Sequence, residues 1–208
     1  MTYSIVARSI NGEVLGVGVI SGSYNVGSRV PWIKRGIGAV ATQAYTNPEL
    51  AKIVLYYLSK GWSAVDALEK ALMRDSGRRY RQLAVITPTG DKAYYTGRNV
   101  PKPYGEALSK NCICIGNLLS SKDVVNEMLR AYIEYEDDII MAIVNALEAG
   151  HNAGGDARGD LSGAILIVGN DPRLKRVDNE IRLYVKADAN PILLLKNMLT
   201  KKLDIKTI

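Results

Sequence analysis

The sequence is poor in the residues that most often build metal sites and catalytic triads. It contains one histidine, His151, and two cysteines, and it contains no phenylalanine. His-x-x-x-His and paired Cys-x-x-Cys spacings are absent, as are the glycine motifs that bind dinucleotides or nucleotide phosphates. We therefore expect neither a metal ion nor another cofactor. A Ser-His-Asp triad would have to use His151, and the Gly-x-Ser-x-Gly motif that often holds its serine is missing.

The two cysteines do not indicate a disulfide. Cys112 and Cys114 lie two residues apart in NCICIG, so in a strand both point to the same face and cannot easily bond to each other. We interpret them as core residues, with a redox or metal role as the alternative.

Long apolar segments are also missing. No run reaches the roughly 18 apolar residues of a membrane span, and the N-terminus does not show the charged and then apolar pattern of a secretion signal. These absences predict a cytoplasmic protein without a membrane partner. The 208 residues suffice for one core of ordinary size but are few for two, so we expect a single domain over residues 1–208.

The charge balance is mildly basic. Lysine and arginine number 27 against 21 aspartates and glutamates, which gives a net charge of +6. The densest cluster, RDSGRRYR over residues 74–81, could receive an anion or could be a solvated helix end. Nothing beyond this cluster favours nucleic acid, so we expect a small-molecule substrate or ligand. Twelve tyrosines without phenylalanine, together with charge-rich helices, would suit a thermophilic protein.

The first part of the chain predicts strands followed by a helix. Alternating and β-branched residues predict a hairpin of strands over 3–8 and 13–20, joined by an Asn-Gly turn. A polar loop over 21–32 and a buried strand over 37–44 follow. The segment 48–61 is apolar on nearly every face, so we expect a helix enclosed by other layers.

The remaining elements extend the same pattern. They are a helix opened by Ser63, a hairpin over 82–97, a strand over 111–117, a helix opened by Ser120, a helix closed by Gly150, strands over 162–169 and 181–186, and a helix from Asn190 with Leu194, Leu195 and Met198 facing inward. Strands and helices therefore come in groups, without βαβ alternation. This order predicts an α+β fold, a four-layer αββα sandwich with two antiparallel sheets between helices.

The second residue suggests a catalytic group. A small residue such as Thr2 permits removal of Met1, and the exposed threonine would then carry a hydroxyl and a free α-amino group together. An α-amino group has a pKa near 7.7 to 8.0, so about a tenth or more is neutral at pH 7 and can act as a base without histidine. The alternative is that Thr2 is an ordinary strand residue.

Seven segments resemble one known family. They are TYSIVAR, VGSRVPW, GAVATQAYTNP, RQLAV, YTG, GNLL and GGDARG, in consistent order across nearly the whole chain. They are similar to the family named domain of unknown function 1028, which belongs to the N-terminal-nucleophile hydrolase superfamily. The resemblance implies an αββα sandwich, Thr2 as the catalytic nucleophile, backbone N–H groups that hold an oxyanion, and a homo-oligomer. It implies no particular reaction, because the family carries no general biochemical assignment.

The sequence departs from both patterns at several positions. Gly18 stands near where an acidic residue follows the second strand in proteasome subunits, and no lysine matches their activating position. Gly22 and Leu161 stand where the family usually has arginine and glutamine. A site around Thr2 would therefore be built differently.

Other polar residues are candidates for substrate binding. They are Ser21, Ser23 and Ser28 in the polar loop, Gln43 and Asn47 after the third strand, and Asn117 after the fourth core strand. Asp156 and Arg158 in the glycine-rich loop form a second candidate pair, since arginine binds carboxylates in bidentate fashion. They could instead form an internal ion pair that holds a turn, and His151 beside them could orient a substrate or be incidental.

We predict a hydrolase of a small amide or ureido compound, with Thr2 as the nucleophile exposed by removal of Met1. The alternatives are a non-catalytic protein on the same scaffold that binds a small anionic metabolite, and an oligomeric scaffold protein.

Overall fold

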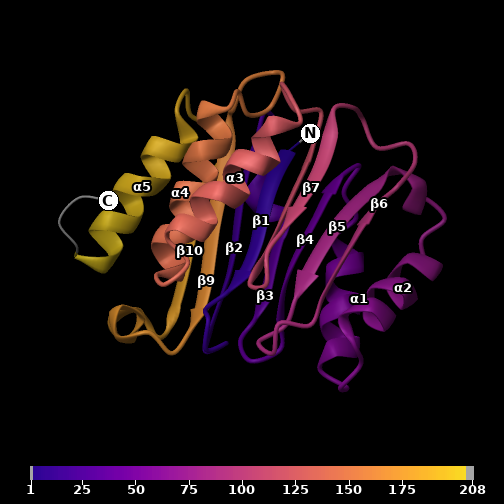
Figure 1. Cartoon of the computed structure of the whole chain (residues 1–208), viewed down its shortest axis with the longest axis horizontal. Coiled ribbons are helices and arrows are strands. Elements are labelled where there is room, and N and C mark those ends of the chain that lie inside the picture. Colours follow the sequence, from indigo (N-terminus) through magenta and orange to yellow (C-terminus); the bar gives the residue numbers. More distant parts are fainter. Residues whose placement is uncertain (1, 205–208) are drawn as a thin grey trace.

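Two antiparallel sheets form the centre of the computed structural model, which describes residues 2–204 (Figure 1). The six-stranded sheet has the order β10-β9-β2-β1-β8-β7, and the four-stranded sheet has the order β3-β4-β5-β6. The strands are β1 (Thr2–Arg8), β2 (Val14–Ser21), β3 (Pro31–Lys34), β4 (Gly38–Ala44), β5 (Arg81–Ile86), β6 (Lys92–Thr96), β7 (Tyr104–Leu108), β8 (Cys112–Asn117), β9 (Ser162–Gly169) and β10 (Glu180–Val185). The predicted grouping of strands and helices is confirmed.

Helices cover the outer face of each sheet. They are α1 (Pro48–Leu58), α2 (Ala64–Met73), α3 (Asp123–Glu134), α4 (Ile139–Asn152) and α5 (Pro191–Leu203). One apolar core joins α3, α4 and α5 to the six-stranded sheet, and another joins α1 and α2 to the four-stranded sheet. A third core lies between the two sheets.

The alternation of β1 decides which of its side chains enter which core. Tyr3 and Ile5 pack with the helices, whereas Val6 belongs to the core between the sheets. Because successive side chains point to opposite faces, Thr2 and Ser4 lie on the same face as Val6. The space between the sheets is therefore apolar at Val6 and becomes polar toward Thr2.

Local capping explains where most helices begin. Asn47, Ser63 and Asn190 each accept a hydrogen bond from a backbone N–H in the first turn of the helix that follows. The starts predicted at Ser63 and Asn190 are thus confirmed. The prediction that Ser120 caps a helix is wrong, because α3 begins at Asp123 and the hydroxyl of Ser120 donates to the carbonyl of Ala153 instead.

Three further predictions are also wrong, two about the burial of helix residues and one about where α4 ends. Helix α1 is not enclosed, since Tyr56 on its outer face is 56% exposed. Leu194 of α5 is 36% exposed and does not face inward. Gly150 does not end α4, which continues to Asn152. A Cβ atom at Gly150 would lie 2.9 Å from Cε2 of Tyr3, so glycine is needed there for the close approach of helix and strand.

Strands β3 and β7 were not predicted. Strand β3 is only four residues long, and β7 reads YGEAL, which lacks a clear apolar alternation. Both are edge strands, which bury fewer side chains than central strands and so carry a weaker sequence pattern.

None of the helices between residues 2 and 204 has the length and apolar composition needed to cross a bilayer.

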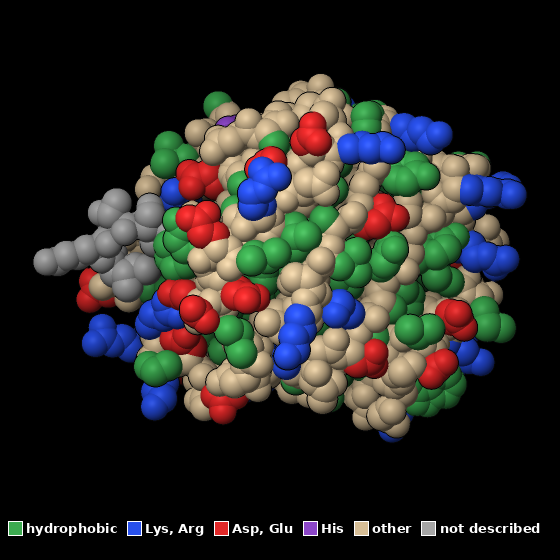
Figure 2. Space-filling view, viewed as in Figure 1, with side chains coloured by type: hydrophobic (Ala, Val, Ile, Leu, Met, Phe, Trp, Pro, Cys, Tyr) green, Lys and Arg blue, Asp and Glu red, His purple; other side chains and the backbone are tan. Residues whose placement is uncertain are grey.

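Figure 2 shows lysine and arginine side chains along the right margin, where α2 and the end of β6 lie. In the basic segment 74–81, Arg81 pairs with Asp75, and Arg79 lies over the ring of Tyr80. The pKa of Asp75 is lowered by its hydrogen bond to Arg81.

Candidate functional site

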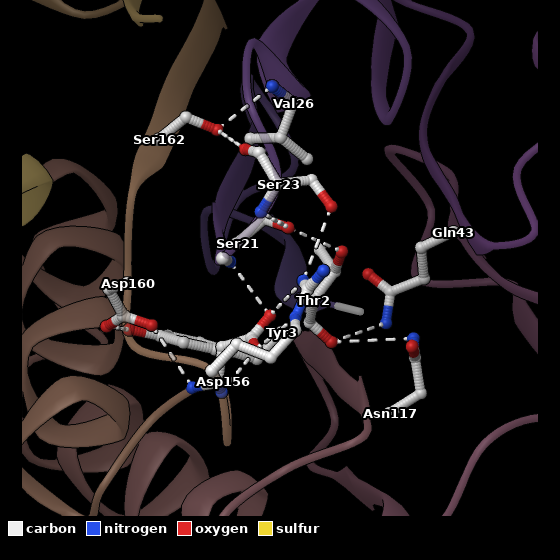
Figure 3. Close-up of polar contacts among 12 residues, drawn as sticks. Thr2, Tyr3, Ser21, Ser23, Val26, Gln43, Asn117, Asp156, Asp160 and Ser162 are labelled. Atoms are coloured by element: carbon white, nitrogen blue, oxygen red, sulfur yellow. Dashed lines mark hydrogen bonds and ion pairs between the residues drawn. The ribbon is translucent and has the colours of Figure 1, made fainter. Parts of the chain in front are cut away.

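Thr2 lies at the head of β1, between β2 and β8, and only 3% of it is exposed (Figure 3). Its hydroxyl Oγ1 donates a hydrogen bond to Oγ of Ser21, 3.1 Å away at the end of β2. On the other side, Thr2 is the cross-strand partner of Asn117 in β8. The two neighbouring strands therefore fix both the side chain and the backbone of Thr2.

The carbonyl oxygen of Thr2 is held by side chains from both sheets. It accepts hydrogen bonds from Nε2 of Gln43 at 3.2 Å and from Nδ2 of Asn117 at 3.5 Å. Gln43 belongs to β4 and Asn117 to β8, so the head of β1 is tied across the layer between the sheets.

Gln82 of β5 links these two amides. Its Oε1 accepts from Nε2 of Gln43 at 2.8 Å and from Nδ2 of Asn117 at 3.0 Å, while its own Nε2 donates to the carbonyl of Gly116. The hydroxyl of Ser4 donates to Oε1 of Gln43 at 2.5 Å. Each amide has one orientation that satisfies its neighbours, so the network fixes which atom is oxygen and which is nitrogen.

One atom of this network is unsatisfied. Oδ1 of Asn117 is buried and has no hydrogen-bond partner among residues 2–204. Buried polar atoms without partners are uncommon in folded proteins, and each one calls for an explanation.

A second network lies on the other side of Ser21, in the loop between α4 and β9. The buried carboxylate of Asp156 accepts a hydrogen bond from the backbone N–H of Gly22 at 2.8 Å. It also accepts from Nε and from one terminal nitrogen of Arg158, at 3.0 and 2.8 Å. This bidentate bond raises the pKa of Arg158.

The glycine at position 22 follows from this contact. A Cβ atom there would lie 2.8 Å from Oδ1 of Asp156 and 2.5 Å from the carbonyl oxygen of Gly159. A larger residue at this position would therefore push Asp156 away from the end of β2.

Asp160 ties the loop to the other face of β1. Its carboxylate accepts a hydrogen bond from the hydroxyl of Tyr3 at 2.5 Å, lies 2.8 Å from Nδ1 of His151, and accepts the backbone N–H of Asp156 at 3.1 Å. Burial, together with the negative charge of Asp160, raises the pKa of Tyr3 well above its usual value. Tyr3 is therefore protonated at neutral pH and acts as a donor.

The structure brings most of the predicted site residues together. Thr2, Ser21, Gln43 and Asn117 are linked directly, as described above. Ser23 joins them through its N–H, which donates to Oγ of Ser21, and its own Oγ accepts a hydrogen bond from Arg158. Asp156 and Arg158 adjoin the same turn.

Ser28 and Asn47 lie elsewhere. The hydroxyl of Ser28 donates to the carbonyl of Asn25, and Ser28 lines a hollow of about 540 Å³ beside Trp32 and Tyr184. Asn47 caps α1. These two polar side chains serve local backbone structure, a role that the sequence of a loop does not distinguish from ligand binding.

Four further residues of these networks were not predicted as site residues: Ser4, Gln82, Tyr3 and Asp160. Ser4 and Gln82 carry one usable signal, because each is a polar side chain on the inward face of an apolar strand. Asp160 carries none, since its partner Tyr3 is 157 residues away in the chain.

No group of three or more histidine, cysteine, aspartate or glutamate residues that could hold a metal ion occurs in the described part of the chain. Cys112 and Cys114 are buried as free thiols in the core against the helices.

Comparison with known proteins identifies the family. Residues 2–195 match the model of a family of unknown function, DUF1028. The chain belongs to this family. A crystal structure of protein SPO2555 from Silicibacter pomeroyi, described with the same family, has 28% sequence identity and a TM-score of 0.86, with 96% of this chain and 88% of that chain covered.

A more distant structure is Anbu (ancestral beta-subunit) from Yersinia bercovieri. It has 14% identity and a TM-score of 0.47, with 98% of this chain and 95% of that chain covered, which is too low to establish a shared fold. None of the curated proteins matches the sequence.

Proposed function

We propose that this DUF1028 protein is a hydrolase of a small amide or ureido compound, with Thr2 as its nucleophile after removal of Met1. The proposal includes the fold, since the two antiparallel sheets with helices packed on their outer faces support the αββα sandwich of N-terminal-nucleophile hydrolases.

The observation that carries the proposal is the way Thr2 is held. Its hydroxyl meets Ser21, and its carbonyl meets amides from both sheets. A nucleophile must be fixed to within a fraction of an ångström of its productive position, and rigid strands with hydrogen-bonded neighbours provide such fixation. An ordinary strand terminus does not require buried polar residues from four strands around it.

The reaction needs only groups carried by Thr2 and one water molecule. Oγ1 attacks the substrate carbonyl carbon, and its proton passes to the neutral α-amine, directly or through water. The tetrahedral intermediate then breaks its carbon–nitrogen bond, and the leaving amine takes the proton from the α-ammonium group. Water attacks the resulting ester by the same route and releases the acid and the free hydroxyl.

The surrounding residues have supporting roles in this proposal. Ser21, Gln43 and Asn117 contact Thr2, and Ser23 contacts Ser21. These four residues would contact the substrate or orient the nucleophile. Asp156 would hold the turn at Gly22 through the hydrogen bond to the backbone N–H of that residue. That N–H is thereby already engaged, so an oxyanion would need other donors.

The alternative, a protein that binds a small anion through Arg158, has less support. Nε and one terminal nitrogen of Arg158 already contact Asp156. A bound anion would have to compete with a buried carboxylate for the same guanidinium group.

The proposal is tested by intact mass and N-terminal sequencing of protein from its native host, followed by labelling with a β-lactone electrophile. We expect Met1 to be absent and one adduct to form on Thr2. Thr2→Ala should lose the adduct completely, while Thr2→Ser keeps it and Thr89→Ala, an exposed control, does not change it. Retention of Met1, or an adduct that persists in Thr2→Ala, contradicts the proposal.

A further inference from the structure

The side-chain amide of Asn117 has a fixed orientation. Its Nδ2 faces two acceptors, the carbonyl oxygen of Thr2 and Oε1 of Gln82. Gln82 cannot be turned over, because its Nε2 already donates to the carbonyl of Gly116 and its Oε1 already accepts from Gln43. The nitrogen of Asn117 must therefore lie on this side, and its oxygen must point the other way.

That oxygen lacks a donor in a place that is otherwise fully satisfied. Asn117 is 0% exposed, and its Oδ1 is the one buried side-chain polar atom without a hydrogen bond among residues 2–204. Leaving such an atom unpaired destabilises the fold, because its hydration is lost and no hydrogen bond replaces it. An apolar residue at this position would have no unpaired polar atom. The presence of Asn117 therefore indicates that its oxygen gains a donor in a later state of the protein.

Removal of Met1 would create such a donor. Asn117 is the cross-strand partner of Thr2, and its side chain lies on the same face of the sheet and bonds to the carbonyl of the same residue. The free α-amino group would belong to Thr2, the residue whose carbonyl oxygen contacts Asn117, so its N–H groups would lie beside the Asn117 side chain. The remaining polar atoms around Thr2 are acceptors or donors that already have partners in the network described above.

We propose that Asn117 is a positioning residue for the α-amine of mature Thr2, with its Oδ1 accepting a hydrogen bond from that amine. The inference rests on the proposed function. One N–H of the amine bonds to Asn117, which leaves the lone pair free to turn toward Oγ1 of Thr2 and accept its proton. A neutral amide is suited to this role because it orients the amine without holding it permanently protonated.

The charged groups nearby are accounted for. Asp156 is paired with Arg158, and Asp160 with His151 and Tyr3, on the side of Ser21. On the side of Asn117 the cross-strand neighbour is Tyr104 of β7. The amine would thus face a neutral acceptor on the Asn117 side and a neutralised carboxylate on the other.

The test is an NMR titration of the α-amine in protein labelled with 13C-threonine, following the Cα resonance of Thr2, which Thr2→Ser identifies. Asn117→Asp places a negative charge at the amine and should raise its proton affinity about tenfold. Asn117→Leu removes the acceptor and should lower it, since the hydrogen bond favours the charged amine. Opposite effects of two substitutions at one site cannot come from structural damage alone. Asn111→Asp makes the same chemical change at the residue before the first residue of β8, beside Arg8, and should leave the titration unchanged.

The outcomes separate the two proposals. Met1 retained in the intact mass means that the proposed function fails. Met1 absent, with a titration unchanged in both Asn117→Asp and Asn117→Leu, overturns the role of Asn117 and leaves Thr2 as nucleophile standing. If Asn117→Asp does not fold, the downward change in Asn117→Leu decides, and its absence overturns the inference.

Discussion

The two ends of the layer between the sheets differ in chemistry although the same strands build both. At one end Val6, Val17 and Ile113 fill the space with apolar side chains. At the other end Ser4, Gln43, Gln82 and Asn117 fill it with hydrogen-bonded groups around Thr2. The apolar end stabilises the fold by removing surface from water, whereas each hydrogen bond at the polar end contributes only about 1 kcal/mol net.

The difference shows what the polar end provides instead of stability. Apolar contacts tolerate small shifts, but an amide network has one arrangement in which every donor meets an acceptor. The head of β1 is therefore held in one geometry. The close-packed apolar end stabilises the fold. The polar end contributes less free energy and instead fixes the position of Thr2.

The largest expected effect is at the apolar end. Ile113→Ala should lower the free energy of unfolding by about 2 to 5 kcal/mol, because Ile113 is fully buried between the sheets and the substitution leaves a cavity. Urea denaturation with an unchanged m value measures it. Ile113→Val, which removes less volume, should cost about 1 kcal/mol. An equal loss in both variants would contradict an explanation by cavity volume.

A smaller loss is expected at the polar end. Gln82→Ala should lower the free energy of unfolding by about 2 kcal/mol, since it leaves donors of Gln43 and Asn117 without their shared acceptor. A double-mutant cycle with Gln43→Ala should give a coupling energy of about 1 kcal/mol. Strict additivity would mean that the amides do not act as one network.

The smallest effect concerns the hydrogen bond between Tyr3 and Asp160 behind Thr2. Tyr3→Phe should cost about 1 kcal/mol at pH 7, because Asp160 keeps its contacts with His151 and with the backbone N–H of Asp156. Because the pKa of Tyr3 is raised in the folded state, its contribution is fully present below pH 10, near the unfolded value, and is lost as the pH rises beyond it. The difference between wild type and variant should therefore shrink in unfolding experiments above pH 10. The exposed control Tyr24→Phe should show no such change.

Sequence patterns were most informative where a single strand or helix carried its own signal. The alternation of residues 3–8 and the capping residues Ser63 and Asn190 predicted the elements that the structure contains. The same approach selected Ser28 and Asn47 for the site, because polar loop residues look alike whether they serve a turn, a cap or a ligand. Their separation from Thr2 depends on the path of the chain.

The partners of Thr2 show the opposite case. Gln43 and Asn117 were selected as residues at strand ends, but the residue that links them, Gln82, reads as an isolated polar residue in an apolar strand. For Asp156 and Arg158 the sequence is compatible with both a ligand site and an internal ion pair. The side chains of these two residues form an ion pair beside Gly22. Only the tertiary structure shows this pairing.

The sequence by itself determined the periodic features of this protein: which segments form most of the strands, which faces of those strands are apolar, and that a threonine follows Met1. These depend on neighbours within a few residues, where the backbone geometry is fixed. Only the tertiary structure decided which polar side chains meet, because β1, β4, β5 and β8 are brought together by packing of two sheets and not by spacing along the chain. The unpaired oxygen of Asn117 is such a feature, since it follows from two neighbours, Thr2 and Gln82, that lie far from Asn117 in the sequence.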